Sequence, residues 1–321
     1  MTNARGPWAV VLAGGEGVRL RSLVHRMLGE ERPKQYVKLL GPRSLLQQTL
    51  DRAALGISRD RTVVVSVRRH VAYLAEEFTG DAQPPYLLVQ PEDRGTAAAI
   101  LYAAQWIAWG DPAATIVVFP SDHFILGEAT FMAHVQEVAG AVERNPDRVI
   151  LVGGQPTSPE AEYGWIEPGA PIDGALDVVS AVRRFWEKPS EAQAQACLRA
   201  GGLWNTAITV ARARTLVEVG ARALPEMSGR LAGLRPFLDS DREVPAVQEA
   251  YARLTRASFS RAVLEPHPEH LGVSRLPRVT WCDLGSPRRV LHVLARMRVR
   301  PAWADLIDAP PPSGRVAVAS R

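Results

Sequence analysis

Short apolar runs alternate with helical patterns along the first half of the chain, and this alternation restricts the folds that the chain can adopt. The runs have the length of buried strands and are Val10–Ala13, Thr62–Val67, Tyr86–Gln90, Thr115–Pro120 and Val149–Val152. The helical patterns between them lie near Leu45–Ala54, Arg69–Phe78, Ala97–Trp109 and Phe131–Arg144. We therefore predict an α/β fold with a Rossmann-like mixed, mostly parallel sheet and helices on both faces. Ligands of such a fold bind where the strands end.

The second half of the chain has a different pattern, which indicates an α+β portion. Strands are predicted at Tyr163–Glu167, Val178–Phe185 and Trp204–Val210, and a helix is predicted at Glu191–Ala200. Residues 212–256 are largely helical in pattern, with breaks expected at Pro225, Pro236 and Pro245. A last strand and loop, Arg278–Gly285, precede a helix near Arg288–Met297. The tail, 301–321, is too rich in proline and alanine to predict regular structure, which leaves a disordered tail open.

A glycine-rich segment follows the first predicted strand. It reads W-A-V-V-L-A-G-G-E-G-V-R-L, with Gly14, Gly15 and Gly17 directly after the strand. Arg19 ends the segment, and Lys34 follows in a P-K-Q sequence. Free backbone N–H groups beside an arginine and a lysine favour an anion site, and phosphates are its natural ligands. The segment fits neither a Walker P-loop nor the G-x-G-x-x-G spacing, so an ordinary strand-to-helix turn remains the alternative.

Composition excludes several classes of protein. The chain has 321 residues, 46% of them hydrophobic, and no apolar run of transmembrane length. Its short polar N-terminus shows no secretory signal. Cys197 and Cys282 have no metal-ligand spacing, which favours reduced thiols and a cytoplasmic location. The net charge is +4, but the arginines are scattered and no nucleic-acid-binding motif accompanies them, so no nucleic-acid or membrane partner is predicted.

Lysine is rare in this chain, which uses arginine for nearly all of its positive charge. The three lysines are Lys34, Lys38 and Lys188. A compact ammonium can reach a single phosphate oxygen in a crowded pocket where a planar guanidinium cannot. The pattern therefore singles out Lys34 in P-K-Q and Lys188 in E-K-P as candidate phosphate ligands.

Several motifs together resemble the sugar-1-phosphate nucleotidylyltransferases, and specifically their mannose-1-phosphate guanylyltransferase branch. The motifs occur in the family's order over about residues 8–295. They are L-A-G-G-E-G-V-R-L (12–20), R-P-K-Q-Y (32–36), S-L-L-Q-Q-T (44–49), Q-P-E-D-R-G-T-A-A-A-I (90–100), F-P-S-D-H (119–123), P-T-S-P-E-A-E-Y-G-W-I-E (156–167), F-W-E-K-P (185–189), W-N-T-A (204–207) and W-C-D-L-G-S (281–286).

The resemblance implies a fold, a domain organisation and a reaction. The fold would be of the nucleotide-diphospho-sugar transferase type. A single nucleotidyltransferase domain, 1–300, would comprise a nucleotide-binding half, 8–155, and a sugar-phosphate-binding half, 156–300. In the reaction, a phosphate oxygen of mannose 1-phosphate or a close hexose 1-phosphate attacks the α-phosphorus of GTP, and pyrophosphate leaves. Such a step depends on positioning and on charge neutralisation, with Mg²⁺ as the cofactor.

The resemblance also implies a role for each matched residue. It implies nucleotide binding by Gly14, Gly15, Gly17, Arg94 and Thr96, catalytic phosphate contacts by Arg19, Lys34 and Lys188, sugar binding by Gly164, Glu187 and Asn205, and Mg²⁺ coordination by Asp122 and Asp283. Carboxylates suit a hard cation. Each aspartate could instead be a turn or cap residue, and Glu187 could simply pair with Lys188.

The chain departs from the family pattern at several positions. The segment between Arg19 and Lys34 is several residues longer than usual, which places Lys34 on a longer loop. The family's R-N-T is Arg94-Gly95-Thr96 here, and its N-S-G is Asn205-Thr206-Ala207. Ser260-Arg261 stands where an acidic-aromatic pair is common. These changes fall near selectivity positions, so the preferred base and sugar stay open.

Two alternatives to the guanylyltransferase hypothesis remain. The same chemistry could use another nucleoside triphosphate or sugar 1-phosphate, or the chain could be a non-catalytic sensor of nucleotide-sugars. The resemblance implies GTP and a hexose 1-phosphate as partners and leaves a homodimer open. Since the sequence ends soon after W-C-D-L-G-S, we expect no appended isomerase domain of the kind that bifunctional members carry.

Overall fold

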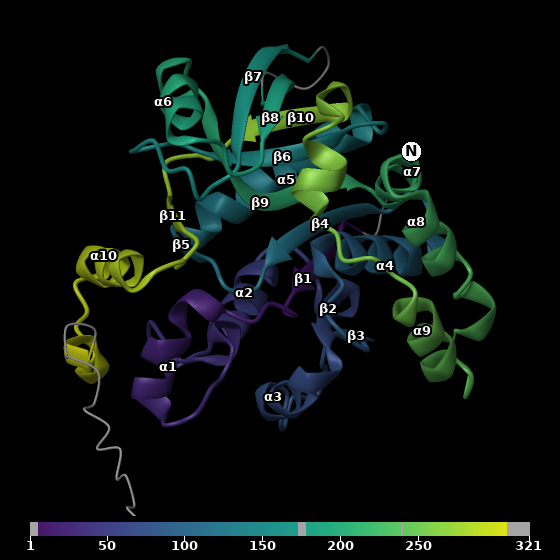
Figure 1. Ribbon diagram of the computed structural model, residues 1–321, viewed down its shortest axis with the longest axis horizontal. Coiled ribbons are helices and arrows are strands. Elements are labelled where there is room, and N and C mark those ends of the chain that lie inside the picture. The colour runs from purple at the N-terminus through teal and green to yellow at the C-terminus, as the bar shows by residue number, and fades with distance from the viewer. Residues whose placement is uncertain (1–5, 173–177, 239, 307–321) are drawn as a thin grey trace, which may run out of the picture.

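The computed structural model describes residues 6–172, 178–238 and 240–306, and within these residues a nine-stranded sheet forms the centre of the molecule (Figure 1). Its strands are β1 (Trp8–Leu12), β2 (Thr62–Val67), β3 (Tyr86–Gln90), β4 (Thr115–Pro120), β6 (Val149–Gly154), β7 (Trp165–Pro171), β8 (Ser180–Trp186), β9 (Leu203–Arg212) and β10 (Leu271–Arg275). A separate antiparallel pair joins β5 (Phe124–Leu126) to β11 (Thr280–Cys282).

The strand order of the sheet is β3-β2-β1-β4-β9-β6-β10-β8-β7. Strands β3, β2, β1 and β4 are parallel neighbours, as are β6 and β10. Only β8 and β9 run against the other strands of this sheet. The predicted mixed, Rossmann-like sheet is confirmed, but β9 enters it between two strands of the first half of the chain.

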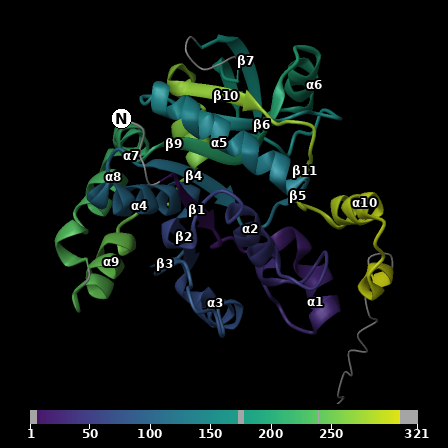
Figure 2. The same ribbon diagram turned by 180° about the vertical axis from the view of Figure 1, so that it is seen from behind.

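The strands bury both faces because their side chains alternate between two layers of core. In β2, Val63 and Val65 pack into one core, and Val64 packs into the other. Helices α4 (Gly95–Gly110), α7 (Ala213–Ala223), α8 (Pro225–Ala232) and α9 (Glu243–Ala252) cover the first face. Helices α2 (Leu45–Ala53), α3 (Val71–Glu77) and α5 (Glu128–Arg144) cover the second, and α5 lies in front of the strands in Figure 2.

Two smaller clusters attach the remaining helices. The motif segment W-C-D-L-G-S leads into α10 (Pro287–Met297), which shares a small core with α1 (Arg21–Leu28). Helix α6 (Glu191–Arg199) packs its buried face against Trp165 and Trp204. The α1–α10 core therefore brings the C-terminal motif next to the glycine-rich segment.

Among the α-helices and strands of the described residues, three were not predicted from the sequence: α1, β5 and β10. The long segment between Arg19 and Lys34, predicted as a loop, is largely α1. Strand β10 reads L-G-V-S-R, and its glycine and serine conceal a buried strand. Pro245 was predicted to break a helix but lies in the first turn of α9, where a missing N–H leaves no intrahelical bond unmade.

Among residues 6–172, 178–238 and 240–306, no helix combines the length and apolar character needed to cross a membrane. Cys197 and Cys282 are both free thiols. Most of the predicted tail, 307–321, lies outside the described residues.

Candidate active site

The glycine-rich segment forms one wall of a cavity of about 880 Å³ where β1, β2 and β3 end. Gly14, Gly15 and Gly17 line this cavity. Gly17 has a φ of 60°, and a methyl group there would lie 2.9 Å from the backbone nitrogen of Lys34. Glycine is therefore needed both for the turn and for the close approach of the Lys34 backbone.

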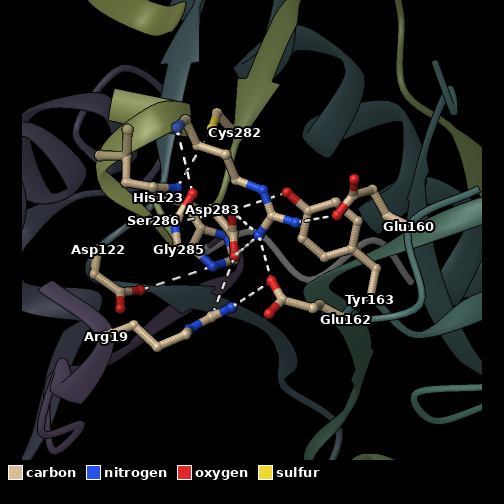
Figure 3. A network of polar contacts seen from close by, with 12 residues as sticks. Arg19, Asp122, His123, Glu160, Glu162, Tyr163, Cys282, Asp283, Gly285 and Ser286 are labelled. Atoms are coloured by element: carbon tan, nitrogen blue, oxygen red, sulfur yellow. Dashed lines mark hydrogen bonds and ion pairs between the residues drawn. The ribbon is translucent and has the colours of Figure 1, made fainter. Parts of the chain in front are cut away.

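Lys34 joins the two aspartates that the sequence assigns to a metal. Its side chain is buried, with the residue only 7% exposed. The Lys34 Nζ lies 3.1 Å from Asp122 Oδ2 and donates a hydrogen bond of 2.7 Å to the backbone carbonyl of Asp283. Figure 3 shows Asp122 and Asp283 in one polar network. Residues from the ends of β4 and β11 thus meet at a single ammonium group.

The Asp283 carboxylate accepts hydrogen bonds from four groups. Tyr163 donates its hydroxyl at 2.8 Å, and the backbone N–H of Gly285 donates at 3.0 Å. The guanidinium groups of Arg289 and Arg19 lie at 3.2 and 3.3 Å. A methyl group at Gly285 would collide with this carboxylate and with Arg19, which explains the glycine of the D-L-G sequence.

Both aspartates are ionised at neutral pH. Burial raises the pKa of the Asp122 carboxyl, but the neighbouring groups, chiefly the Lys34 ammonium, together hold that pKa below its usual value. Burial likewise opposes ionisation of Asp283, yet Arg289 and the Tyr163 hydrogen bond contribute to a lowered pKa. Burial lowers the pKa of His123, whose Nδ1 accepts a hydrogen bond of 3.3 Å from Trp281. His123 is therefore a neutral neighbour of Asp122.

The three residues assigned to the sugar lie together. Asn205 donates its backbone N–H to the Gly164 carbonyl at 2.8 Å. A methyl group at Gly164 would lie 3.1 Å from the Asn205 Cβ and 3.2 Å from Glu187 Oε2. Gly164 follows Tyr163, whose hydroxyl binds Asp283, so this cluster adjoins the aspartate network. The departure at Ala207 has a backbone consequence, because this residue adopts a φ of 59° that suits glycine.

Other predicted residues have structural partners of their own. Arg94 donates to the Tyr251 carbonyl at 3.1 Å and pairs with Glu92, and it does not line the 880 Å³ cavity. Thr96 lines that cavity, although its hydroxyl accepts the Phe259 N–H at 2.9 Å. Lys188 has a φ of 53°, and its side chain has no hydrogen bond or ion pair with the described part of the chain. The roles of these residues in ligand binding stay predictions.

Sequence reasoning missed several members of the network. Tyr163 and Arg289 bind Asp283 directly, while Glu160 pairs with Arg289 and Glu162 with Arg19. Three of these residues stand in the quoted motif at 156–167, so the motif itself was a usable signal. Arg289 lies in α10, six residues after Asp283. Only the fold shows that its guanidinium group points toward the Asp283 carboxylate.

The fold and site define the class of the protein. The chain belongs to the nucleotidyl transferase family, since that family's model matches residues 8–298. Its relatives include the xanthan biosynthesis protein XanB of Xanthomonas campestris, 33% identical over 88% of this chain and 58% of XanB. The mannose-1-phosphate guanylyltransferase of Escherichia coli is 29% identical over 87% of this chain and 58% of that protein. The resemblance predicted from the motifs is therefore confirmed.

A solved structure supports the same assignment. The Thermus thermophilus protein described as a mannose-1-phosphate geranyltransferase superposes with a TM-score of 0.75 and is 29% identical. The match covers 92% of this chain and 80% of that one. This agreement confirms the nucleotide-diphospho-sugar transferase type of fold. The chain spans only 58% of the length of each of the two curated relatives.

Proposed function

We propose that this protein transfers a guanylyl group from GTP to mannose 1-phosphate, or to a close hexose 1-phosphate, and releases pyrophosphate. One observation carries the proposal: the Lys34 ammonium lies between Asp122 and the Asp283 carbonyl. This point adjoins the glycine-lined cavity on one side and the Gly164 cluster on the other. A nucleotide and a sugar phosphate placed in these two regions would bring their phosphates together at Lys34.

The chemistry requires positive charge and alignment more than proton transfer. An oxygen of the sugar phosphate forms a bond to the α-phosphorus, while the bond from the α-phosphorus to the bridging oxygen breaks and its electron pair leaves on pyrophosphate. The attacking oxygen is already anionic, so no general base is needed. Lys34 and Arg19 supply cationic donors for the triphosphate, and Lys188 supplies one for the sugar phosphate. The Glu187 carboxylate and the Asn205 amide suit the sugar hydroxyls.

The residues present fit a divalent cation. Within the described ranges, no cluster of three or more histidine, cysteine and acidic side chains could hold a metal. Mg²⁺, however, commonly uses one or two carboxylates and takes its other ligands from water and substrate phosphates. Asp122 and Asp283 are both ionised, and the Asp283 carboxylate is close enough to act against the lowering of the Asp122 pKa. Bound there, Mg²⁺ would neutralise phosphate charge.

The choice of GTP and mannose 1-phosphate rests on the names of the relatives and on the motifs. The cavity beside the glycine segment is lined in addition by Arg69, Arg256 and Arg261, which are suited to a triphosphate. A cytoplasmic location and a homodimer are further parts of this proposal.

Pyrophosphate release tests this function directly. The purified protein would be assayed with each of the four common nucleoside triphosphates against several hexose 1-phosphates, with and without Mg²⁺. We expect the highest kcat/KM with GTP and mannose 1-phosphate. Faster turnover of another pair would assign a different nucleotide or sugar. An absence of turnover with every pair, together with tight binding of GDP-mannose, would replace the enzyme by a sensor.

A further inference from the structure

A second cavity, of about 770 Å³, lies beside α10 and is lined by none of the residues that the sequence assigned to nucleotide, sugar or metal. Its walls include the loops after β6 and β10 as well as the first turns of α10. Its volume is in the range of small-molecule sites. We call it the α10 cavity.

One face of α10 supplies this cavity with unpaired basic side chains, two of which are arginines. Arg288, His292 and Arg296 line it and lie four residues apart, so they follow one another along the helix. Their side chains have no hydrogen bond or ion pair with any residue that the structure describes. The opposite face of α10 is buried through Val290 and Leu294 in the core shared with α1. Packing thus fixes the helix with these basic side chains directed toward the cavity.

The acidic residues of the cavity do not compensate this charge. Glu160 pairs with Arg289, and Glu162 pairs with Arg19 at 3.0 Å and with Arg289 at 3.3 Å. Both carboxylates therefore already have cationic partners in the aspartate network. The charge left over at the α10 cavity is positive, and it favours an anionic ligand.

The rest of the lining is aromatic. Tyr163, Trp204 and Trp281 form a cluster of ring contacts at the cavity wall, with centroid distances of 4.9 Å and 5.4 Å from Tyr163. Tyr163 and Trp204 are buried, whereas Trp281 is partly exposed. The exposed part of the Trp281 ring is suited to stacking on a flat ring.

We propose that the α10 cavity is a second ligand site, which binds a nucleoside phosphate. Arginine side chains donate hydrogen bonds to phosphate oxygens. The ring of a tryptophan can stack on a nucleobase. The site is separate from the cavity at the glycine segment, and none of the described residues lines both cavities. Arg289 lines the α10 cavity and also binds the Asp283 carboxylate at 3.2 Å. A molecule bound in the α10 cavity would thus lie next to Arg289, which contacts the candidate metal-binding residue Asp283.

Equilibrium dialysis with GDP, in buffer free of divalent metal, tests the proposal. The double variant Arg288→Gln with Arg296→Gln removes two exposed cations from the cavity. Arg183→Gln is the matched control, because Arg183 is an exposed arginine of β8 that does not line the cavity. We expect the double variant to bind one GDP fewer per chain than the wild type and the control. Equal binding by all three proteins would overturn the proposal, and far-UV circular dichroism would establish that each is folded.

Competition defines the ligand class. In the wild type, GMP is expected to displace the GDP bound in the α10 cavity, which is the GDP that the double variant lacks. Inorganic phosphate or guanosine alone, at the same concentration, is expected to displace this GDP at least tenfold less well. If inorganic phosphate competes as well as GMP does, the aromatic wall does not contribute and the assignment of a nucleoside phosphate is wrong.

Discussion

The Lys34 ammonium lies 3.1 Å from the Asp122 carboxylate, although the two residues belong to segments separated by β2, β3 and β4. The same ammonium reaches the backbone carbonyls of Asp283 and Leu284 at 2.7 and 3.4 Å. One side chain of a lysine-poor protein therefore fixes the relative positions of three segments.

Lys34→Arg is expected to lower kcat although the charge is preserved. The three oxygens around Nζ leave little room for a guanidinium, and overpacking of this kind costs about 1–3 kcal/mol. If this cost falls on the transition state, its lower end corresponds to roughly a fivefold loss of rate. Lys38→Arg serves as the control, since Lys38 is exposed. Steady-state pyrophosphate release measures both variants, and a wild-type rate for Lys34→Arg would contradict the crowded-site argument.

Asp122→Asn is expected to reduce turnover by about 100-fold, the order of loss seen when one electrostatic group is removed from an active site. The amide would keep the size of the side chain but lose the charge that pairs with Lys34. Asp147→Asn, at a carboxylate whose side chain is 84% exposed, controls for the loss of any surface charge. Full activity of Asp122→Asn at ordinary Mg²⁺ concentrations would place the metal elsewhere.

Tyr163→Phe tests a residue that only the structure singled out. Loss of the hydroxyl removes one donor to Asp283, and a hydrogen bond to a charged group contributes about 1.5–3 kcal/mol. We expect roughly a tenfold fall in kcat/KM, with the ring packing retained. Tyr73→Phe, which loses an exposed hydrogen bond to the Glu31 carbonyl, is the control. Equal kinetics for the two variants would show that the Tyr163 hydroxyl is not needed.

Gly164→Ala is expected to raise the KM for the sugar 1-phosphate more than the KM for the nucleotide. The added methyl would press on Asn205 and Glu187 at 3.1 and 3.2 Å. A single misplaced methyl group in a binding pocket costs about 1–3 kcal/mol, which is tenfold or more in affinity. Gly41→Ala has open space around the new methyl and should leave both KM values unchanged. A similar rise in both KM values for Gly164→Ala would argue against a sugar-specific role.

His134→Gln is expected to weaken the dependence of stability on pH. His134 lies in α5 with its Nε2 3.0 Å from the Ser274 hydroxyl, and burial lowers its pKa below the usual 6.5. The unfolded chain therefore binds a proton at a higher pH than the folded chain, so the free energy of unfolding falls as the pH drops below 6.5. Denaturant unfolding from about pH 7.5 to about pH 5.5 should show a smaller fall in the variant. The exposed His25→Gln should behave like the wild type, and an unchanged fall in His134→Gln would contradict the prediction.

The fold was largely predictable because its first half repeats a simple pattern. The strands from Thr62–Val67 to Thr115–Pro120 were located to the residue, since buried parallel strands read as continuous apolar runs. Strand β10 escaped notice because Gly272 and Ser274 interrupt its apolar character, while its pairing with β6 supplies the burial. Helix α1 escaped notice because its stability comes from the core that it shares with α10, a contact across most of the chain.

The candidate site was predictable only in part. Motifs identified Lys34, Asp122 and Asp283, and the structure brings these three together. Partners such as Arg289 could not be predicted, because the sequence around an arginine in a helix does not indicate which carboxylate it will contact. A motif residue can also have a structural contact that the motif does not predict. Arg94, for example, donates a hydrogen bond to the backbone carbonyl of Tyr251.

The placement of β9 has a consequence for how the protein forms during synthesis. This strand inserts antiparallel between β4 and β6, both of which precede it on the ribosome by dozens of residues. Until residues 203–212 emerge, the facing edges of those two nascent strands have no hydrogen-bonding neighbour and are open to association with other chains. Chaperone binding to ribosome-bound intermediates is therefore expected to persist through translation of the first two hundred residues and to end as β9 closes the gap.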